Sequence, residues 1–222
     1  MADGHNKEID FNFLSEEASQ NYFADLNIEL LKGAHIQKDS YYLYSLLQEK
    51  EGELRSYYNS LYGLELVRDR YNNETFFYLD FLDGKGKLSR QDRHRELSAL
   101  NIITGILLVK MYYDKYFELQ KIVTWEDLEH HIMESEYSDG LKKIFFEEVR
   151  EFYSDTEWES VRKRILKCIR EFETVGWVTK IPSNEHEIHF QLKESISRFA
   201  KLYEKELLHF DEFVTSYLKQ LR

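Results

Sequence analysis

The sequence predicts a mainly helical protein with small β-hairpins. Residues 53–80 and 156–191 predict it, because each stretch joins an amphipathic helix to a glycine and then to two short strands. A helix followed by such a hairpin is typical of a winged-helix domain, so we expect two of these domains in tandem. The expected division is a mobile tail at 1–20, a first winged-helix domain at 21–82, a basic connector at 83–95, a second winged-helix domain at 96–192 and a C-terminal helix at 193–222.

The first domain is expected to open with helices. Apolar residues at helical spacing from Tyr22 to Leu31 predict the first helix, and Asp39 or Ser40 can cap the second. Gly52 is expected to separate the second helix from the third. Three helices should therefore precede the first hairpin.

The turn of the first hairpin is the clearest signal in this domain. Gly63 ends the third helix, since a residue just past a helix end often has positive φ. Strands are expected at residues 64–70 and 75–80. They join across Asn72 and Asn73, because asparagine tolerates the left-handed conformation that a tight hairpin turn requires.

The connector holds the strongest local concentration of positive charge. Its basic side chains are Lys85, Lys87, Arg90, Arg93 and Arg95. Lysine and arginine contact phosphates without reading bases, so we predict that the connector binds the DNA backbone. The alternative is a solvated linker.

The second domain is expected to form around a buried helix from about Arg93 to Phe117. Residues 97–111 are largely apolar, but polar residues interrupt them, and a bilayer span needs about 20 apolar residues. Thr124 with Asp127 has the spacing of a capped helix start. One more helix is expected at residues 141–149. This part of the chain therefore predicts a helical core.

The helix before the second hairpin is the candidate recognition helix. Thr156 and Glu159 have the spacing of a capping box, and Gly176 stops the helix. Strands are expected at residues 177–181 and 187–191. The positive residues away from the apolar stripe of the helix are Arg162, Lys163, Lys167 and Arg170. We predict that these residues contact DNA; the alternative is local pairing with the glutamates that flank them.

The last helix, at residues 194–221, has a longer apolar stripe than one small domain needs. Most positions in such a stripe belong to a core. Surplus apolar surface on a helix also suits the docking of a partner. The residues predicted to be exposed for partner binding are Tyr203, Phe210 and Tyr217.

Composition limits the classes of function. A net charge of −11 argues against a protein that coats nucleic acid by bulk electrostatics, so any DNA contact must be a local basic patch. The single cysteine, Cys168, excludes an intramolecular disulfide framework, and the first residues lack the pattern of a secretion signal. We expect a cytoplasmic protein without a membrane segment.

Catalytic and cofactor signatures are missing from the sequence. The Gly-Lys-Gly-Lys stretch at 84–87 lacks the earlier glycine and the following Ser or Thr of a phosphate-binding loop. His130 and His131 lie near Glu126, but adjacent residues on a helix point apart, so we expect a solvated face instead of a metal site. We predict no enzyme activity, metal or cofactor.

Several short motifs follow one another along the chain. They are Leu31, Gly33, His35 and Ile36 in a Leu-x-Gly-x-His-Ile pattern, Glu65 and Leu66, then Phe76, Phe77, Tyr78 and Leu79, and finally Leu97, Ser98 and Leu100. In order and spacing they resemble the MukE family, including its MksE type, over most of the chain after the tail. The family often has arginine where Ala34 stands, so a phosphate contact there is not carried over.

The resemblance implies a non-enzymatic tandem winged-helix subunit of a bacterial condensin, active in chromosome condensation and segregation at the nucleoid. It implies binding to a MukF- or MksF-like kleisin, and through the kleisin to a MukB- or MksB-like SMC ATPase. It also implies a homodimer and DNA contact without strong sequence specificity. Two alternatives stay open: a related subunit of a plasmid-defence SMC complex, and a free-standing winged-helix transcription regulator. The near balance of charge over 156–191 disfavours the regulator, which needs a strongly basic recognition helix.

Overall fold

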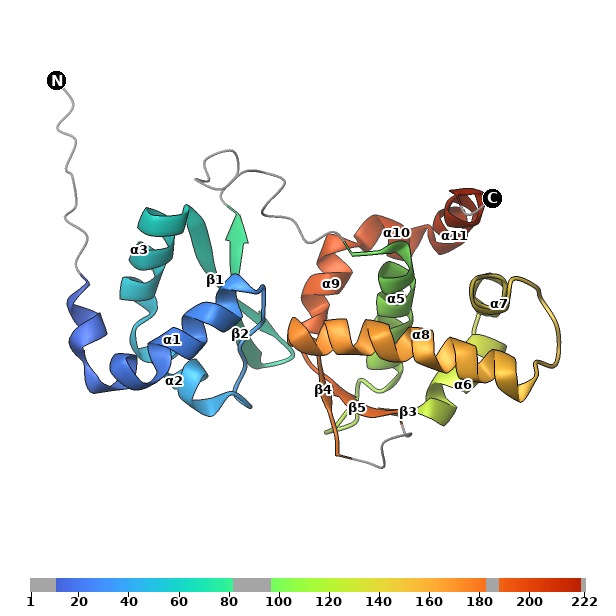
Figure 1. The fold of residues 1–222 in the computed structure, drawn as a ribbon, viewed down its shortest axis with the longest axis horizontal. Coiled ribbons are helices and arrows are strands. Elements are labelled where there is room, and N and C mark those ends of the chain that lie inside the picture. The colour runs from blue at the N-terminus through green and yellow to red at the C-terminus, as the bar shows by residue number, and fades with distance from the viewer. Residues whose placement is uncertain (1–10, 82–96, 183–187, 221–222) are drawn as a thin grey trace, which may run out of the picture. The chain divides into compact units, whose positions relative to one another are not determined.

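The computed structural model describes residues 11–81, 97–182 and 188–220 (Figure 1). The chain divides into two compact units, Met1–Arg95 and Glu96–Arg222. Both units are mainly helical, and their strands form small antiparallel sheets. Within the described ranges, none of the helices combines the length and the apolar content needed to cross a bilayer.

In the first unit the helices come first along the chain and the two strands follow. Its elements are η1 (Asn12–Ser15), α1 (Glu17–Leu31), α2 (Tyr41–Glu49), α3 (Glu51–Tyr62), β1 (Leu64–Tyr71) and β2 (Glu74–Phe81). Lys50 separates α2 from α3 with φ −117° and ψ 27°, so the predicted break at Gly52 is wrong. Gly52 lies in the first turn of α3, where the amide groups lack a partner within the helix in any case.

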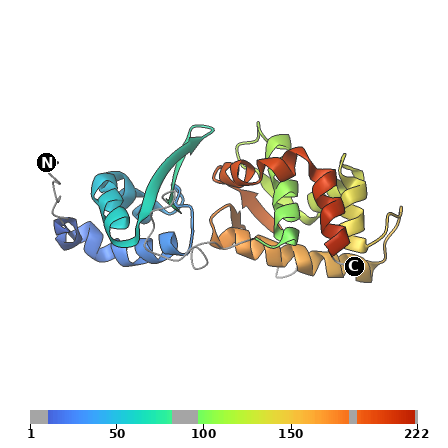
Figure 2. The ribbon, with the colours of Figure 1, turned by 90° about the horizontal axis from the view of Figure 1, so that it is seen from above.

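The hairpin of β1 and β2 confirms the sequence prediction. Gly63 ends α3 with φ 66°, and the strands pair in unbroken register up to the turn. Asn72 and Asn73 have φ 47° and 64°. Positive φ at both central residues is what a two-residue hairpin turn of type I′ requires. The hairpin extends beyond the helices of its unit (Figure 2).

An isolated bridge lies along the other edge of β2. The Ile36 amide donates to the Phe77 carbonyl over 2.8 Å, and the Phe77 amide donates to the Ile36 carbonyl over 2.9 Å. Both side chains are buried. The segment between α1 and α2 therefore borders β2 on the side opposite β1.

The core of the first unit includes part of the expected tail. Phe13 in η1 is 3% exposed, and its ring meets Phe23 and Tyr57 edge to face, with centroids 5.8 and 6.2 Å apart. Phe11 meets Tyr57 in the same way at 5.8 Å. Buried aromatic pairs of this kind stabilise a core. The prediction of a tail at 1–20 is thus wrong for residues 11–20, while residues 1–10 lie outside the described part.

The second unit repeats a helical start and a helix-to-hairpin order. Its elements are α5 (Ala99–Asp114), β3 (Ile122–Thr124), α6 (Trp125–Glu134), α7 (Ser138–Phe146), α8 (Asp155–Thr174), β4 (Val178–Lys180), β5 (His189–Leu192), α9 (Ile196–Leu202), α10 (Glu204–Leu208) and α11 (Phe210–Gln220). β5 lies between β3 and β4, and both pairings are antiparallel. The sequence did not predict β3.

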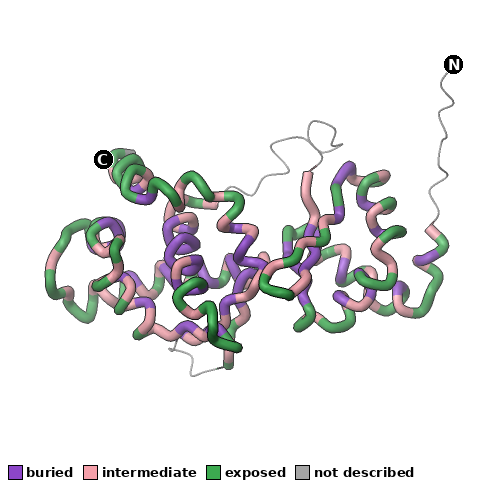
Figure 3. The backbone as a smooth tube through the Cα atoms, turned by 180° about the vertical axis from the view of Figure 1, so that it is seen from behind, coloured by how far each residue is buried: buried purple, intermediate pink, exposed green. Residues whose placement is uncertain are grey.

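Helix α5 is the buried centre of the second unit (Figure 3). The Ser98 hydroxyl caps it by accepting from the Asn101 amide, so it begins later than the predicted Arg93 and ends before Phe117. Gly105 gives α9 room to approach, because a Cβ built there would lie 2.3 Å from Cζ of Phe199. The predicted buried helix is confirmed.

The N-cap of helix α8 lies two residues earlier than predicted. The Ser154 hydroxyl accepts from the Glu157 amide, and the Glu157 carboxylate accepts from the Ser154 amide over 2.8 Å. The capping box predicted at Thr156 and Glu159 is therefore wrong. Glu157 is also the partner of Arg150, which fixes the earlier of the two similar patterns.

The predicted single C-terminal helix is broken twice. Tyr203 has φ −116° and ψ 32°, and His209 has φ −123° and ψ 45°. Between these breaks the chain turns, so that α9 packs on α5 and α11 packs on α7. Tertiary packing thus divides an apolar stripe that looks continuous in the sequence.

Candidate nucleic-acid interface

The structure describes only one of the two groups of residues predicted to bind DNA. The connector residues Lys85, Lys87, Arg90, Arg93 and Arg95 lie outside the described residues. The other group, Arg162, Lys163, Lys167 and Arg170, lies on α8. The geometry of a candidate interface therefore comes from α8.

One face of α8 belongs to the core and the opposite face is open. The buried face consists of Val161, Ile165, Cys168, Ile169 and Phe172. Lys163, Lys167 and Arg170 are exposed and follow one another at i, i+4 and i+7. Residues at this spacing share one helical face, so three cationic side chains form a stripe roughly 10 Å long. We call these three residues the α8 stripe.

Three flanking acidic residues of α8 have their own partners, and only one of these partners belongs to the α8 stripe. Glu171 accepts from the Asn101 amide nitrogen over 2.7 Å, and Glu173 pairs with Lys180 at 2.9 Å. Glu159 pairs with Lys163 at 3.5 Å. Among the residues that the structure describes, no carboxylate lies within ion-pair distance of Lys167 or Arg170. The expected neutralisation by neighbouring glutamates therefore applies only to Lys163.

Two arginines of α8 face inward. The guanidinium of Arg162 lies 5.3 Å from the ring centroid of Trp125, at the start of α6. Arg164 donates to the backbone carbonyls of Ile144 and Phe145 over 3.0 and 3.1 Å. Both side chains fasten α8 to its neighbours, so the structure does not place Arg162 on the α8 stripe.

The residues predicted to bind a partner are less exposed than expected. Phe210 is 3% exposed, with its ring centroid 4.5 Å from that of Tyr137, so the prediction that it is exposed is wrong. Burial against α7 is the physical reason, since the break at His209 turns α11 toward that helix. Tyr203 and Tyr217 are half-buried.

Other apolar side chains are more exposed than the predicted ones. Phe117 and Leu119, between α5 and β3, are 96% and 101% exposed, and Phe152 is 84% exposed. In the first unit Tyr41 and Tyr42 are exposed at the start of α2. Sequence reasoning missed all five, because an apolar residue in a loop or a first helical turn gives no periodic signal.

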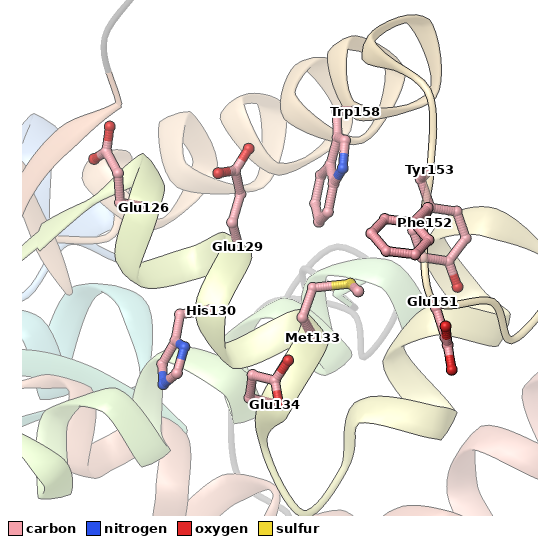
Figure 4. Close-up of a pocket in the computed structure, with 9 residues that line it drawn as sticks. All are labelled: Glu126, Glu129, His130, Met133, Glu134, Glu151, Phe152, Tyr153 and Trp158. Atoms are coloured by element: carbon pink, nitrogen blue, oxygen red, sulfur yellow. The ribbon is translucent and has the colours of Figure 1, made fainter.

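The histidines of α6 do not converge on a metal site. Figure 4 shows His130 on α6 with Glu126 and Glu129, and all three line one hollow. His131 instead pairs with Asp114, with 2.9 Å between Nε2 and Oδ2. The described residues contain no group of three or more His, Cys, Asp or Glu placed to hold a metal ion.

The thiol of Cys168 is buried on the inner face of α8. Burial raises the pKa of this thiol, because a thiolate loses solvation inside a core. Reactive cysteines instead have a lowered pKa and an accessible sulfur. Cys168 therefore acts as a small packed residue, as the sequence predicts.

Comparison with known proteins matches most of the chain. A family model described as condensin complex protein MksE matches residues 21–204. The chain is also 24% identical over 188 residues to the chromosome partition protein MukE of Histophilus somni (strain 2336), an alignment that covers 84% of this chain and 71% of that protein.

Proposed function

The chain belongs to the MksE family of condensin complex proteins, and we propose that it acts as a non-enzymatic subunit of a bacterial condensin in chromosome condensation and segregation. The observation that supports this most is the extent of the family match, residues 21–204, which includes elements of both units. The likeness to a chromosome partition protein supports the same role.

We propose further that each unit is a winged-helix domain. In the second unit, α5, β3, α6, α8, β4 and β5 follow in that order around a sheet ordered β3-β5-β4. In the first unit, α1, Ile36, α2, α3, β1 and β2 follow in the same order, with β2 between Ile36 and β1. The second unit has an additional helix, α7, between α6 and α8, and the shared order of the other elements supports a tandem repeat of one fold.

The DNA contact is assigned to the α8 stripe and the basic connector. With a net charge of −11, the protein binds phosphates only where cations gather and lack local partners. Lys167 and Arg170 meet this condition, since both are exposed. A stripe of point charges on a helix face positions a phosphate backbone without base readout, so the proposed binding is not sequence-specific.

The proposed partners follow from family membership. The subunit binds a kleisin, reaches the SMC-like ATPase through it, forms a homodimer and works in the cytoplasm at the nucleoid. Tyr203 and Tyr217, which keep part of their surface, are candidate contacts on the C-terminal helices. Because only part of each side chain is exposed, we expect each tyrosine to contact the partner at its surface and not to insert into a pocket of the partner.

An affinity purification tests this function. The tagged protein is captured from its native cells at moderate salt with nuclease present, and the bound proteins are identified by mass spectrometry. We expect a kleisin-like protein and a large coiled-coil ATPase in stoichiometric amounts. Recovery of the protein alone, with tight binding to one DNA sequence in a selection, would instead identify a transcription regulator.

A further inference from the structure

A hollow of about 380 Å³ lies between α6, the start of α8 and the chain that joins α7 to α8 (Figure 4). Two kinds of side chain dominate its lining. The aromatic residues are Phe152, Tyr153 and Trp158, and the acidic residues include Glu129, Glu134 and Glu151. Aromatic faces and carboxylates both attract cations, so the lining has a consistent preference.

The aromatic wall is held in place by packing behind it. Tyr153 stacks on Phe146 with ring centroids 3.6 Å apart. Trp158 meets Phe146 at 4.8 Å and Trp125 at 5.9 Å, edge to face in both cases. Preorganised walls lower the ordering cost of binding a ligand. The hollow is therefore shaped before any ligand arrives.

Three of the carboxylates around the hollow lack a basic partner among the described residues. Across residues 11–81, 97–182 and 188–220, no lysine or arginine lies within ion-pair distance of Glu129, Glu134 or Glu151. A fourth lining carboxylate, Glu126, stays charged, because its own backbone amide and then the Thr124 hydroxyl hold its pKa below the usual range. The negative charge is thus available to an incoming cation.

The same aromatic cluster already accepts guanidinium groups elsewhere. Arg150 lies over Tyr153 with 4.8 Å between guanidinium carbon and ring centroid, and Arg162 lies over Trp125 at 5.3 Å. Neither arginine lines the hollow. The charge of Arg162 also helps to lower the pKa of Glu126 at the rim, after the two hydrogen bonds named above. Both contacts show that a guanidinium suits these rings.

We propose that the hollow binds an arginine side chain presented by a basic segment of a partner protein. The guanidinium lies against Trp158 and pairs with Glu129, while the methylene stem covers Phe152 and Glu151 adds negative charge on the other side of the hollow. Phe152, at 84% exposure, supplies the apolar surface for that stem. DNA does not fit, because the acidic rim repels phosphates. The proposal depends on the lining alone and stands apart from the proposed function.

Nuclear magnetic resonance of the full-length protein tests the proposal. The indole N–H signal of Trp158 is assigned by its loss in Trp158→Phe and followed during titration with a five-residue peptide, blocked at both ends, with one central arginine. A second peptide with neutral, isosteric citrulline is the control. We expect a saturable shift with arginine and roughly tenfold weaker binding with citrulline.

Two variants with the same change of charge locate the site. Glu129→Gln with Glu151→Gln is expected to weaken arginine-peptide binding about tenfold. Glu204→Gln with Glu212→Gln, on exposed positions of α10 and α11, is expected to leave binding unchanged. Equal binding of both peptides, equal loss in both variants, or no saturable shift would overturn the proposal. A shift that grows with protein concentration alone would also overturn it, since the occupant would then be a second copy.

Discussion

The two units share one order of elements but use it differently. In the first, a 12-residue helix, α3, precedes a hairpin of eight-residue strands. In the second, a 20-residue helix, α8, precedes strands of three and four residues. The first unit thus extends its hairpin and the second extends its helix.

The basic side chains also differ between the two units. In the first unit Arg55 and Arg68 both pair with Glu51, at 2.8 and 3.1 Å. In the second, Lys167 and Arg170 stand exposed on the longer helix. A shared order of elements therefore does not imply the same binding surface, and the DNA contact that we propose for a helix belongs to the second unit.

The prediction with the largest expected effect tests whether the middle strands of the two sheets are structurally equivalent. Phe77 bridges to Ile36, and Phe190 pairs with Val123, so both residues occupy the middle strand opposite the first extended segment. Both phenylalanines are at most 1% exposed. Phe77→Ala and Phe190→Ala should each lower the local free energy of unfolding by about 3–5 kcal/mol, because each leaves a core cavity. Hydrogen exchange read by mass spectrometry measures each unit, and a loss in only one would contradict the correspondence.

Two helical glycines are expected to respond with opposite sign. Gly105→Ala forces a Cβ against the buried ring of Phe199, and overpacking of this kind costs about 1–3 kcal/mol. Gly52→Ala meets no atom within 4 Å and should stabilise α3 by about 0.5 kcal/mol. All three tryptophans lie in the second unit, so urea unfolding followed by tryptophan fluorescence reports Gly105→Ala there. An unchanged midpoint would mean that α9 can move away from α5.

The DNA contact should depend on the α8 stripe and not on net charge. Lys167→Gln with Arg170→Gln is expected to weaken duplex binding about tenfold and to reduce the slope of log K against log salt by about 2. Lys143→Gln with Lys205→Gln removes two exposed charges from α7 and α10 of the same unit and should have little effect. Fluorescence anisotropy at several salt concentrations measures both variants. An unchanged slope in the first would remove the α8 stripe as the contact.

The smallest expected effect concerns the start of α8. The Ser154 amide, then Arg150 and the Ser154 hydroxyl, lower the pKa of Glu157 from 4.5 to about 2. A carboxyl whose pKa is lower in the folded state stabilises the fold above about pH 4.5, and this contribution is lost as the pH falls toward 2. The difference in Tm between the wild type and Glu157→Gln should therefore shrink on acidification from pH 6 to pH 3. Glu159→Gln is the matched control, because it leaves the cap intact; a constant difference for Glu157→Gln would contradict the role of the cap.

The sequence was most informative where local chemistry decides the structure. Asn72 and Asn73 predicted the hairpin turn, and Gly63 predicted the end of α3, because few residues adopt positive φ. It was least informative where packing decides. Neither Tyr203 nor His209 is a helix breaker by type, yet the chain turns at both.

Between these extremes, two local signals competed. Ser154 with Glu157 and Thr156 with Glu159 both fit the capping pattern, and the structure uses the first pair, in which Glu157 also pairs with Arg150. The sequence predicted which basic residues form the candidate interface. It did not predict that the neighbouring carboxylates of α8 bind other partners. Two of these partners, Asn101 and Lys180, lie outside α8.

The long hairpin of the first unit has a consequence for self-association. β1 pairs with β2 on one side, and an open strand edge can recruit another chain and seed aggregation. Its exposed positions Glu65, Arg68 and Arg70 are all charged, one negative and two positive, and place charge along that strand. A second β1 approaching in the wrong register would have to desolvate these charges. Charged side chains on β1 therefore disfavour edge-to-edge pairing of two hairpins.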